Sequence, residues 1–99
     1  MTMVEEHRET WGLDDIEREV RTILADVLEK PLRTIRPDSP LDEGLGVDSL
    51  ALIETQVSIE ERFGVVMPDI DEESVTHFRT VKDLVQAVAE QLRSRLDDA

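Results

Sequence analysis

Apolar residues recur at helical spacing in three stretches of the chain. In the first stretch they follow one another at steps of four, three, one, three and one, which places them on one side of a 3.6-residue helix. Asp14 and Glu17 stand three residues apart, as in a reciprocal N-terminal cap, so we expect a helix that begins at Asp14 and is closed by Pro31. Its buried stripe is predicted to be Ile16, Val20, Ile23, Leu24, Val27 and Leu28.

Two further long helices are predicted on the same grounds. One begins close to position 49 and runs to about Phe63, with Gly64 past its end, where glycine adopts a left-handed conformation at least cost. We expect its core-facing stripe to be Leu50, Ile53, Val57 and Phe63, with Ile59 beside them. The last helix begins at Thr80, again three residues before an acid, Asp83. Its stripe is Val81, Leu84, Val85, Val88 and Leu92, extended by Leu96.

The segments between these helices differ in character. Residues 30–48 hold three prolines and two glycines, which forbid a long regular element. A loop of this length in a compact domain is either functional or pinned by its own side chains. The candidate pins are Leu32, Ile35, Leu41 and Leu45. A short acidic turn or helix is expected at about 71–77.

These elements predict an all-α protein, a small four-helix bundle of three longer helices and one short helix. The long loop joins its first and second helices. Residues 1–12 are polar and without a period, so we expect a flexible lead-in, with Trp11 tucked against the first helix. The folded domain is predicted to span residues 13–96 and to be followed by a short tail at 97–99.

Charge and composition narrow the classes of function. Eleven basic and 24 acidic residues give a net charge of −13, which repels nucleic-acid phosphates and anionic membranes. The same charge favours partners with basic patches, although it can equally serve solubility alone. There is no cysteine, no signal peptide and no stretch approaching the ~20 apolar residues of a membrane span. We therefore expect a soluble, cytoplasmic monomer that binds neither nucleic acid nor membrane.

The sequence contains no catalytic constellation. Neither His7 nor His77 lies in a recognisable nucleophile setting, and there is no G-x-S-x-G turn. No H-x-x-x-H pair, calcium-binding loop or phosphate-binding loop with its lysine is present, so we expect no metal site. The chain is therefore not predicted to be an enzyme in its own right.

Ser49 is the remaining candidate for chemistry. It follows a glycine-bearing loop and stands at the start of a helix, directly after Asp48. A purely structural interpretation is that Ser49 or Asp48 caps the helix, because both residue types are favoured there. Free amides and the positive end of the helix dipole would also stabilise a phosphodiester at that place.

Four sequence signals in order resemble the acyl carrier protein family. Gly46-Val47-Asp48-Ser49-Leu50 matches the family's G-x-D-S-L motif, and Glu60-Glu61-Arg62-Phe63-Gly64 matches its E-x-x-F-G segment. Val66-Met67-Pro68-Asp69 and Thr80-Val81 resemble the short apolar stretch and the start of the last helix. The similarity covers about residues 14–93.

The resemblance implies a carrier rather than a catalyst. A separate phosphopantetheinyl transferase would move 4′-phosphopantetheine from coenzyme A onto Ser49 Oγ in a magnesium-dependent reaction. The arm's terminal thiol would hold acyl groups as thioesters, which fits a chain without cysteine. The carrier would present the arm, shelter part of the cargo between helices, and dock on acyl-loading and chain-processing enzymes with basic patches.

The resemblance also implies a docking surface around Ser49. Asp48, Glu54 and Glu61 match positions that meet arginines and lysines of partners, and we expect them on the solvent side of the helix. Leu50 is expected in the core, in contact with partners, or both. Ala51 and Leu52 would make the surface near Ser49 more apolar, because Ala51 stands where the family often has an acid.

Further departures from the family pattern bear on the cargo. Thr55 and Gln56 are polar where many fatty-acid carriers use aliphatic residues along the helix that faces the cargo. They favour a specialised pathway, polyketide or hybrid acyl and aminoacyl assembly, over bulk fatty-acid synthesis. A carrier of aminoacyl or peptidyl groups is the nearest rival function, although such carriers often have a glycine where this chain has Val47. Two functions of a different class also fit these residues, namely an acidic helical adaptor without a cofactor and a hydrolase that uses Ser49.

Overall fold

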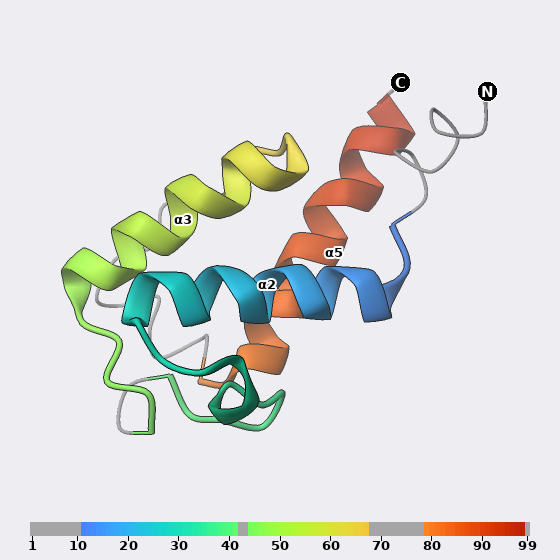
Figure 1. The fold of residues 1–99 in the computed structure, drawn as a ribbon. Coiled ribbons are helices and arrows are strands. Elements are labelled where there is room, and N and C mark those ends of the chain that lie inside the picture. Colours follow the sequence, from blue (N-terminus) through green and yellow to red (C-terminus); the bar gives the residue numbers. More distant parts are fainter. Residues whose placement is uncertain (1–10, 42–43, 68–78, 99) are drawn as a thin grey trace, which may run out of the picture.

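The computed structural model of the protein describes residues 11–41, 44–67 and 79–98; for Ser49 and 95–98 it describes the backbone alone. Its elements are α2 (Leu13–Leu28), a 3₁₀ turn η1 (Leu32–Thr34), α3 (Ser49–Phe63) and α5 (Val81–Asp98). Helix α2 crosses in front of α5 and runs beside α3 (Figure 1). No β-strand occurs within the described ranges, and the prediction of a small all-helical bundle is confirmed. The short helix predicted at 71–77 lies outside the described residues.

The start of α2 differs from the prediction. The helix begins at Leu13, and Gly12, in an extended conformation, occupies the N-cap position without a side-chain hydrogen bond. Asp14 therefore lies inside the first turn and does not form the expected cap with Glu17. Together with Asp15 it places acidic side chains at the positive end of the helix dipole.

The end of α2 is set before Pro31 is reached. Glu29 adopts a left-handed conformation with φ 55°. The Lys30 amide donates to the Ala25 carbonyl at 3.0 Å, and the Glu29 amide to the Asp26 carbonyl at 3.4 Å. These two bonds form a Schellman motif, which satisfies carbonyls that the helix end would leave unpaired.

The long loop is held from both sides. Ile35, Leu41 and Leu45 are buried as predicted, whereas Leu32 is 43% exposed, so its assignment as a pin is wrong. Around Leu32 the loop is instead held by polar contacts. The guanidinium of Arg21 in α2 donates to the backbone carbonyls of Leu32 and Ile35, and the Leu32 side chain is left toward solvent.

The beginning of α5 is tied to the same loop. Thr80 and Asp83 form the predicted reciprocal cap: Asp83 Oδ2 accepts from the Thr80 amide at 3.2 Å, and Thr80 Oγ1 accepts from the Asp83 amide at 3.4 Å. The Val81 amide donates to the Ser39 carbonyl at 3.2 Å, and the Leu41 amide to the Arg79 carbonyl at 2.9 Å. The loop thereby supplies an acceptor to a helix amide that has none inside the helix.

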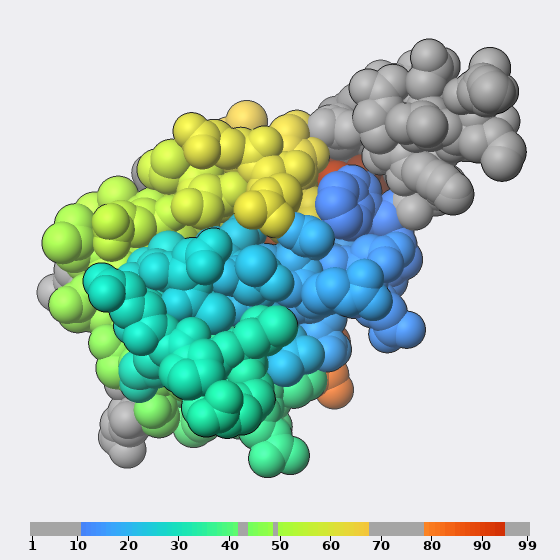
Figure 2. Space-filling view, viewed as in Figure 1, coloured from blue at the N-terminus to red at the C-terminus, as the bar shows by residue number. Residues whose placement is uncertain are grey.

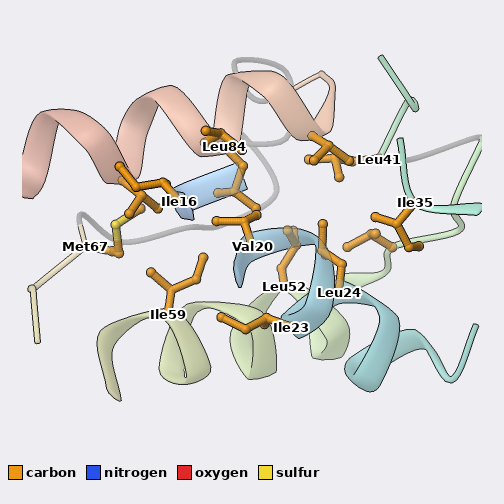
Figure 3. Close-up of a cluster of buried hydrophobic side chains, with 14 of the residues drawn as sticks. Ile16, Val20, Ile23, Leu24, Ile35, Leu41, Leu52, Ile59, Met67 and Leu84 are labelled. Atoms are coloured by element: carbon orange, nitrogen blue, oxygen red, sulfur yellow. The ribbon is translucent and has the colours of Figure 1, made fainter. Parts of the chain in front are cut away.

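The core is aliphatic and draws on all three helices and the loop (Figure 3). Every member of the predicted α5 stripe from Val81 to Leu92 is buried, whereas the Leu96 side chain lies outside the description. The ring of Trp11 contacts α3, where it meets Phe63 edge-on with centroids 4.7 Å apart. Helix α5 also includes residues 97 and 98, which the sequence pattern assigned to the tail.

Candidate functional site

The end of the long loop leads into α3 through Gly46, where the chain turns, and Val47, which is anchored. Gly46 has φ 71°, a left-handed conformation that costs glycine least, and no atom lies within 4 Å of where a Cβ would stand. Val47 is 7% exposed, and its amide donates to the Leu41 carbonyl at 2.9 Å. The position at which α3 begins is therefore determined by the packing of the loop.

Asp48 caps α3. It has an extended backbone, and its Oδ1 accepts from the Ala51 amide at 2.8 Å while its carbonyl accepts from the Leu52 amide at 2.9 Å. Ser49 is the first helical residue. The sequence left open which of the two residues caps, and the structure assigns the cap to Asp48. The predicted exposure of the Ser49 hydroxyl lies outside the described side chains.

The buried face of α3 differs in part from the prediction: Ile59 and Phe63 are buried as expected, but the first three residues of the predicted stripe are not. Leu50, Ile53 and Val57 are 66%, 54% and 47% exposed, so their assignment to the core is wrong. The face that packs inward consists of Ala51, Leu52, Thr55, Ile59 and Phe63. Both sets recur at helical spacing.

A groove of about 430 Å³ lies beside the exposed apolar residues. Ile53 and Val57 line it from α3, and Val27 lines it from α2. The remaining lining residues are Asp26, Glu54 and Ser58, so the lining combines apolar and acidic side chains. The surfaces of α2 and α3 meet along the face shown in Figure 2.

The residues expected at the docking surface fall into two groups. Asp48, Leu50, Glu54 and Glu61 are exposed. Ala51 and Leu52 are only 7% and 6% exposed, which corrects their placement on the surface: they pack into the bundle.

The structure adds residues that sequence reasoning missed. Ile53 and Val57 lie on the surface, but their spacing is equally that of a core stripe, so the pattern gave no means of finding them. Asp26 and Val27 of α2 line the same groove and carry no sequence signal for a role beside α3.

The two polar residues linked to the cargo also differ from each other. Thr55 is 1% exposed, and its Oγ1 is a buried polar atom without a hydrogen-bond partner. Gln56 is half-buried and donates through Nε2 to Glu60 Oε2 at 3.5 Å. Glu60 Oε2 also accepts from the Met67 amide at 2.9 Å, which ties the end of α3 to the segment that follows.

The described residues contain no cluster of histidine and acidic side chains that could hold a metal ion. Within the same ranges, no helix combines the length and the apolar character needed to span a bilayer.

The sequence matches a family model described as a phosphopantetheine attachment site, over residues 18–88. The chain belongs to the acyl carrier protein family. It is 40% identical to an acyl carrier protein of Rickettsia bellii (strain RML369-C) over 78 residues, which cover 79% of this chain and 87% of the relative. It is 38% identical to "Acyl carrier protein 3" of Ralstonia nicotianae over 77 residues, or 78% of this chain and 85% of the relative.

A second Rickettsia bellii relative, from strain OSU 85-389, is also 40% identical over 78 residues, or 79% of this chain and 93% of the relative. As a member of this family the chain is a non-catalytic carrier with a covalently attached 4′-phosphopantetheine. The N-terminus of α3 fits such a group. Asp48 takes over the cap, and the neighbouring Gly46, Asp48 and Leu50 are exposed.

Proposed function

We propose that Ser49 is the residue that carries the phosphopantetheine arm, and that the carrier holds acyl groups on it for transfer between enzymes. The observation that supports this proposal most is that Asp48, and not Ser49, makes the capping hydrogen bond at the start of α3. Asp48 Oδ1 makes the capping hydrogen bond, so the hydroxyl of the next residue is not needed for the cap. When bound, the arm supplies a terminal thiol that forms thioesters.

The residues around Ser49 have distinct parts in this proposal. The first amides of a helix lack intrahelical acceptors and point toward the attachment site, where they and the helix dipole stabilise the negative phosphodiester. The chain turns at Gly46, and the buried Val47 holds the end of the loop so that the helix begins at Ser49. The proton of the serine hydroxyl is removed in the transferase's active site, so the carrier needs no base of its own.

The docking surface of the proposal is the exposed side of α3 rather than a single row of acids. Asp48, Glu54 and Glu61 supply carboxylates, and Leu50 supplies an exposed apolar contact beside the arm. Ile53 and Val57 extend this surface to the groove that they share with α2. A partner that combines a basic rim with a protruding apolar side chain fits this surface. Phosphopantetheinyl transferase and acyl-loading enzymes are the partners proposed.

Intact mass after incubation with coenzyme A and a broad-specificity transferase tests the attachment. We expect one added phosphopantetheine on the wild type and none on Ser49→Ala. The substitution should change the free energy of unfolding by less than about 0.5 kcal/mol, because Asp48 makes the cap. Ser94→Ala, which removes an exposed hydroxyl from α5, is the matched control and should load normally.

A mass increase on Ser49→Ala, or no increase on the folded wild type, would contradict the assignment. The second result would favour an acidic adaptor without a cofactor. Labelling of Ser49 by a serine-directed phosphonate would favour a hydrolase instead.

The proposal extends to the pathway, the location of the carrier and the type of group that it carries. Thr55 and Gln56 favour a specialised route, polyketide or hybrid assembly, over bulk fatty-acid synthesis. The carrier is proposed to act as a cytoplasmic monomer whose folded part begins at residue 13 and extends to the end of α5 at residue 98. Loading by an adenylating enzyme with an amino acid, rather than with an acyl group, would identify the aminoacyl type.

A further inference from the structure

Thr55 is a buried hydroxyl that its own helix does not satisfy. Its side chain is 1% exposed, and Oγ1 has no hydrogen-bond partner. A threonine inside a helix commonly donates to the carbonyl four residues earlier. Thr22 of α2 does so, with Oγ1 2.8 Å from the Arg18 carbonyl oxygen. Thr55 lacks this bond, so its hydroxyl is available to a group that the folded chain itself does not supply.

On the inward face of α3, the buried positions on either side of Thr55 are apolar. Thr55 lies one helical turn from Ala51 and from Ile59. On the same face, Leu52 and Ile59 project toward Val20 and Ile23 of α2 (Figure 3). A hydroxyl buried without a partner destabilises a fold, and a valine of the same shape would avoid that penalty. A ligand that forms a hydrogen bond with this hydroxyl would offset the cost of burying it.

The position of Thr55 relative to the attachment site suits a cargo contact. Thr55 stands six positions after Ser49 in the same helix, a rise of about 9 Å along the axis of α3. Helix α2 packs against both α3 and α5, whereas the described parts of α3 and α5 make no comparable contact with each other. An acyl chain whose arm is attached at the start of α3 can run along this helix toward Thr55. It can therefore enter between α3 and α5 without breaking a close helix pair.

We propose that the Thr55 hydroxyl binds an oxygen atom carried by the acyl chain, so that this carrier selects hydroxyl- or keto-bearing acyl groups over saturated ones. The inference rests on the proposed attachment at Ser49. The apolar positions one turn before and after Thr55 suit a chain that is mostly hydrocarbon with a single oxygen function. They do not suit the amide-rich arm, which would bring further polar groups in need of partners. Thr55 is thus a specificity-determining residue for the cargo.

The experiment compares thermal unfolding of three proteins, wild type, Thr55→Val and Thr22→Val. Each is loaded with octanoyl, 3-hydroxyoctanoyl or 5-hydroxyoctanoyl pantetheine from the corresponding coenzyme A thioester, with loading verified by intact mass. In the wild type, at least one hydroxyacyl form should unfold about 4–8 °C above the octanoyl form, because one added hydrogen bond is gained in the folded state. In Thr55→Val this difference should vanish.

Two controls separate a binding role from a purely structural one. Thr55→Val without cargo should be at least as stable as the wild type, because the orphan hydroxyl is gone. Thr22→Val removes a satisfied hydroxyl and should keep the full difference between hydroxyacyl and octanoyl forms.

The outcomes distinguish the two proposals. Proteins that load but show equal melting temperatures for octanoyl and both hydroxyoctanoyl chains would overturn the role of Thr55 and leave the attachment at Ser49 intact. The same holds if the difference persists in Thr55→Val. A wild type that takes up no arm would overturn the attachment at Ser49, and the cargo role would fall with it.

Discussion

Asp48 and Ser49 are adjacent, yet the structure gives the cap to only one of them. The carboxylate of Asp48 accepts from the Ala51 amide at 2.8 Å and so closes the first turn of α3. The residue as a whole remains exposed beside the proposed attachment site. Asp48 is thus a structural cap, and we propose that it is also a charge that partners meet.

These two tasks of Asp48 can be separated by two substitutions. Asp48→Ala should lower the free energy of unfolding by about 1 kcal/mol, because the cap is lost. Asp48→Asn keeps a capping oxygen and should preserve most of that stability while removing the charge. Urea unfolding followed by circular dichroism measures the first effect, and the rate of transferase loading at low salt measures the second.

An equal loss of stability in both variants would show that the charge, not the hydrogen bond, stabilises α3. Unchanged loading of Asp48→Asn would remove Asp48 from the docking surface.

At the scale of the helix, α3 presents two apolar faces of similar spacing. One is Leu50, Ile53 and Val57, and the other is Leu52, Ile59 and Phe63 with the smaller Ala51 and Thr55. Periodicity alone cannot choose between them, because both satisfy a 3.6-residue repeat. The choice follows from packing against α2, to which α3 is also joined by the ion pair of Arg62 with Glu19. The face left outside becomes an apolar surface near the start of the helix.

Truncating one residue from each face tests the orientation of α3. Val57 is 47% exposed and Ile59 is fully buried. We expect Ile59→Ala to cost about 2–5 kcal/mol, because it leaves a cavity in the core. Val57→Ala should change stability by less than about 0.5 kcal/mol. Denaturant midpoints of the two variants give the comparison, and a larger cost for Val57→Ala would reverse the orientation described.

The ends of α2 show how local signals compete within an element. Asp14 and Glu17 have the spacing of a cap, but the helix begins one residue earlier because Gly12 takes the N-cap position. At the other end, Glu29 enters a left-handed conformation and forms a Schellman motif two residues before Pro31. The existence of the helix follows from its apolar stripe, whereas its exact ends depend on which of several adjacent residues satisfies the terminal backbone groups.

At the scale of the whole molecule, the net charge of −13 acts over distances longer than any contact. Such a field accelerates encounter with basic partners and is screened over about 8–10 Å at physiological salt. The field alone does not define a docking site. In the proposed docking surface, the exposed acids Asp48, Glu54 and Glu61 of α3 add a local attraction for a basic patch to this long-range field.

Charge reversals separate the local from the global effect. Glu54→Lys and Glu61→Lys should each slow transferase loading several-fold at low salt, and less at high salt, because they place a cation opposite the partner's basic patch. Glu90→Lys changes the net charge equally on the exposed side of α5 and is the control. Loading rates at two salt concentrations give the result. If Glu90→Lys slows loading as much, the docking surface on α3 is not specific.

The long loop is pinned as expected, but its pins are only partly apolar. Ile35, Leu41 and Leu45 are buried, as their types indicate. The guanidinium of Arg21 and the bridge between Pro40 and Thr80 are two polar attachments of the loop. Neither carries a sequence signal, because a backbone carbonyl can be bound by a side chain from any element that the fold brings near it.

The sequence by itself determined the helical class, the approximate extent of α2, α3 and α5, the core stripe of α5, and the motif around Ser49. These follow from local propensity and periodicity, which depend on residues close together in the chain. Only the tertiary structure decided which face of α3 is buried, that Ala51 and Leu52 pack inward, and that the Thr55 hydroxyl is left without a partner. Those outcomes depend on which helix lies opposite, and a repeat of 3.6 residues carries no information about its neighbour.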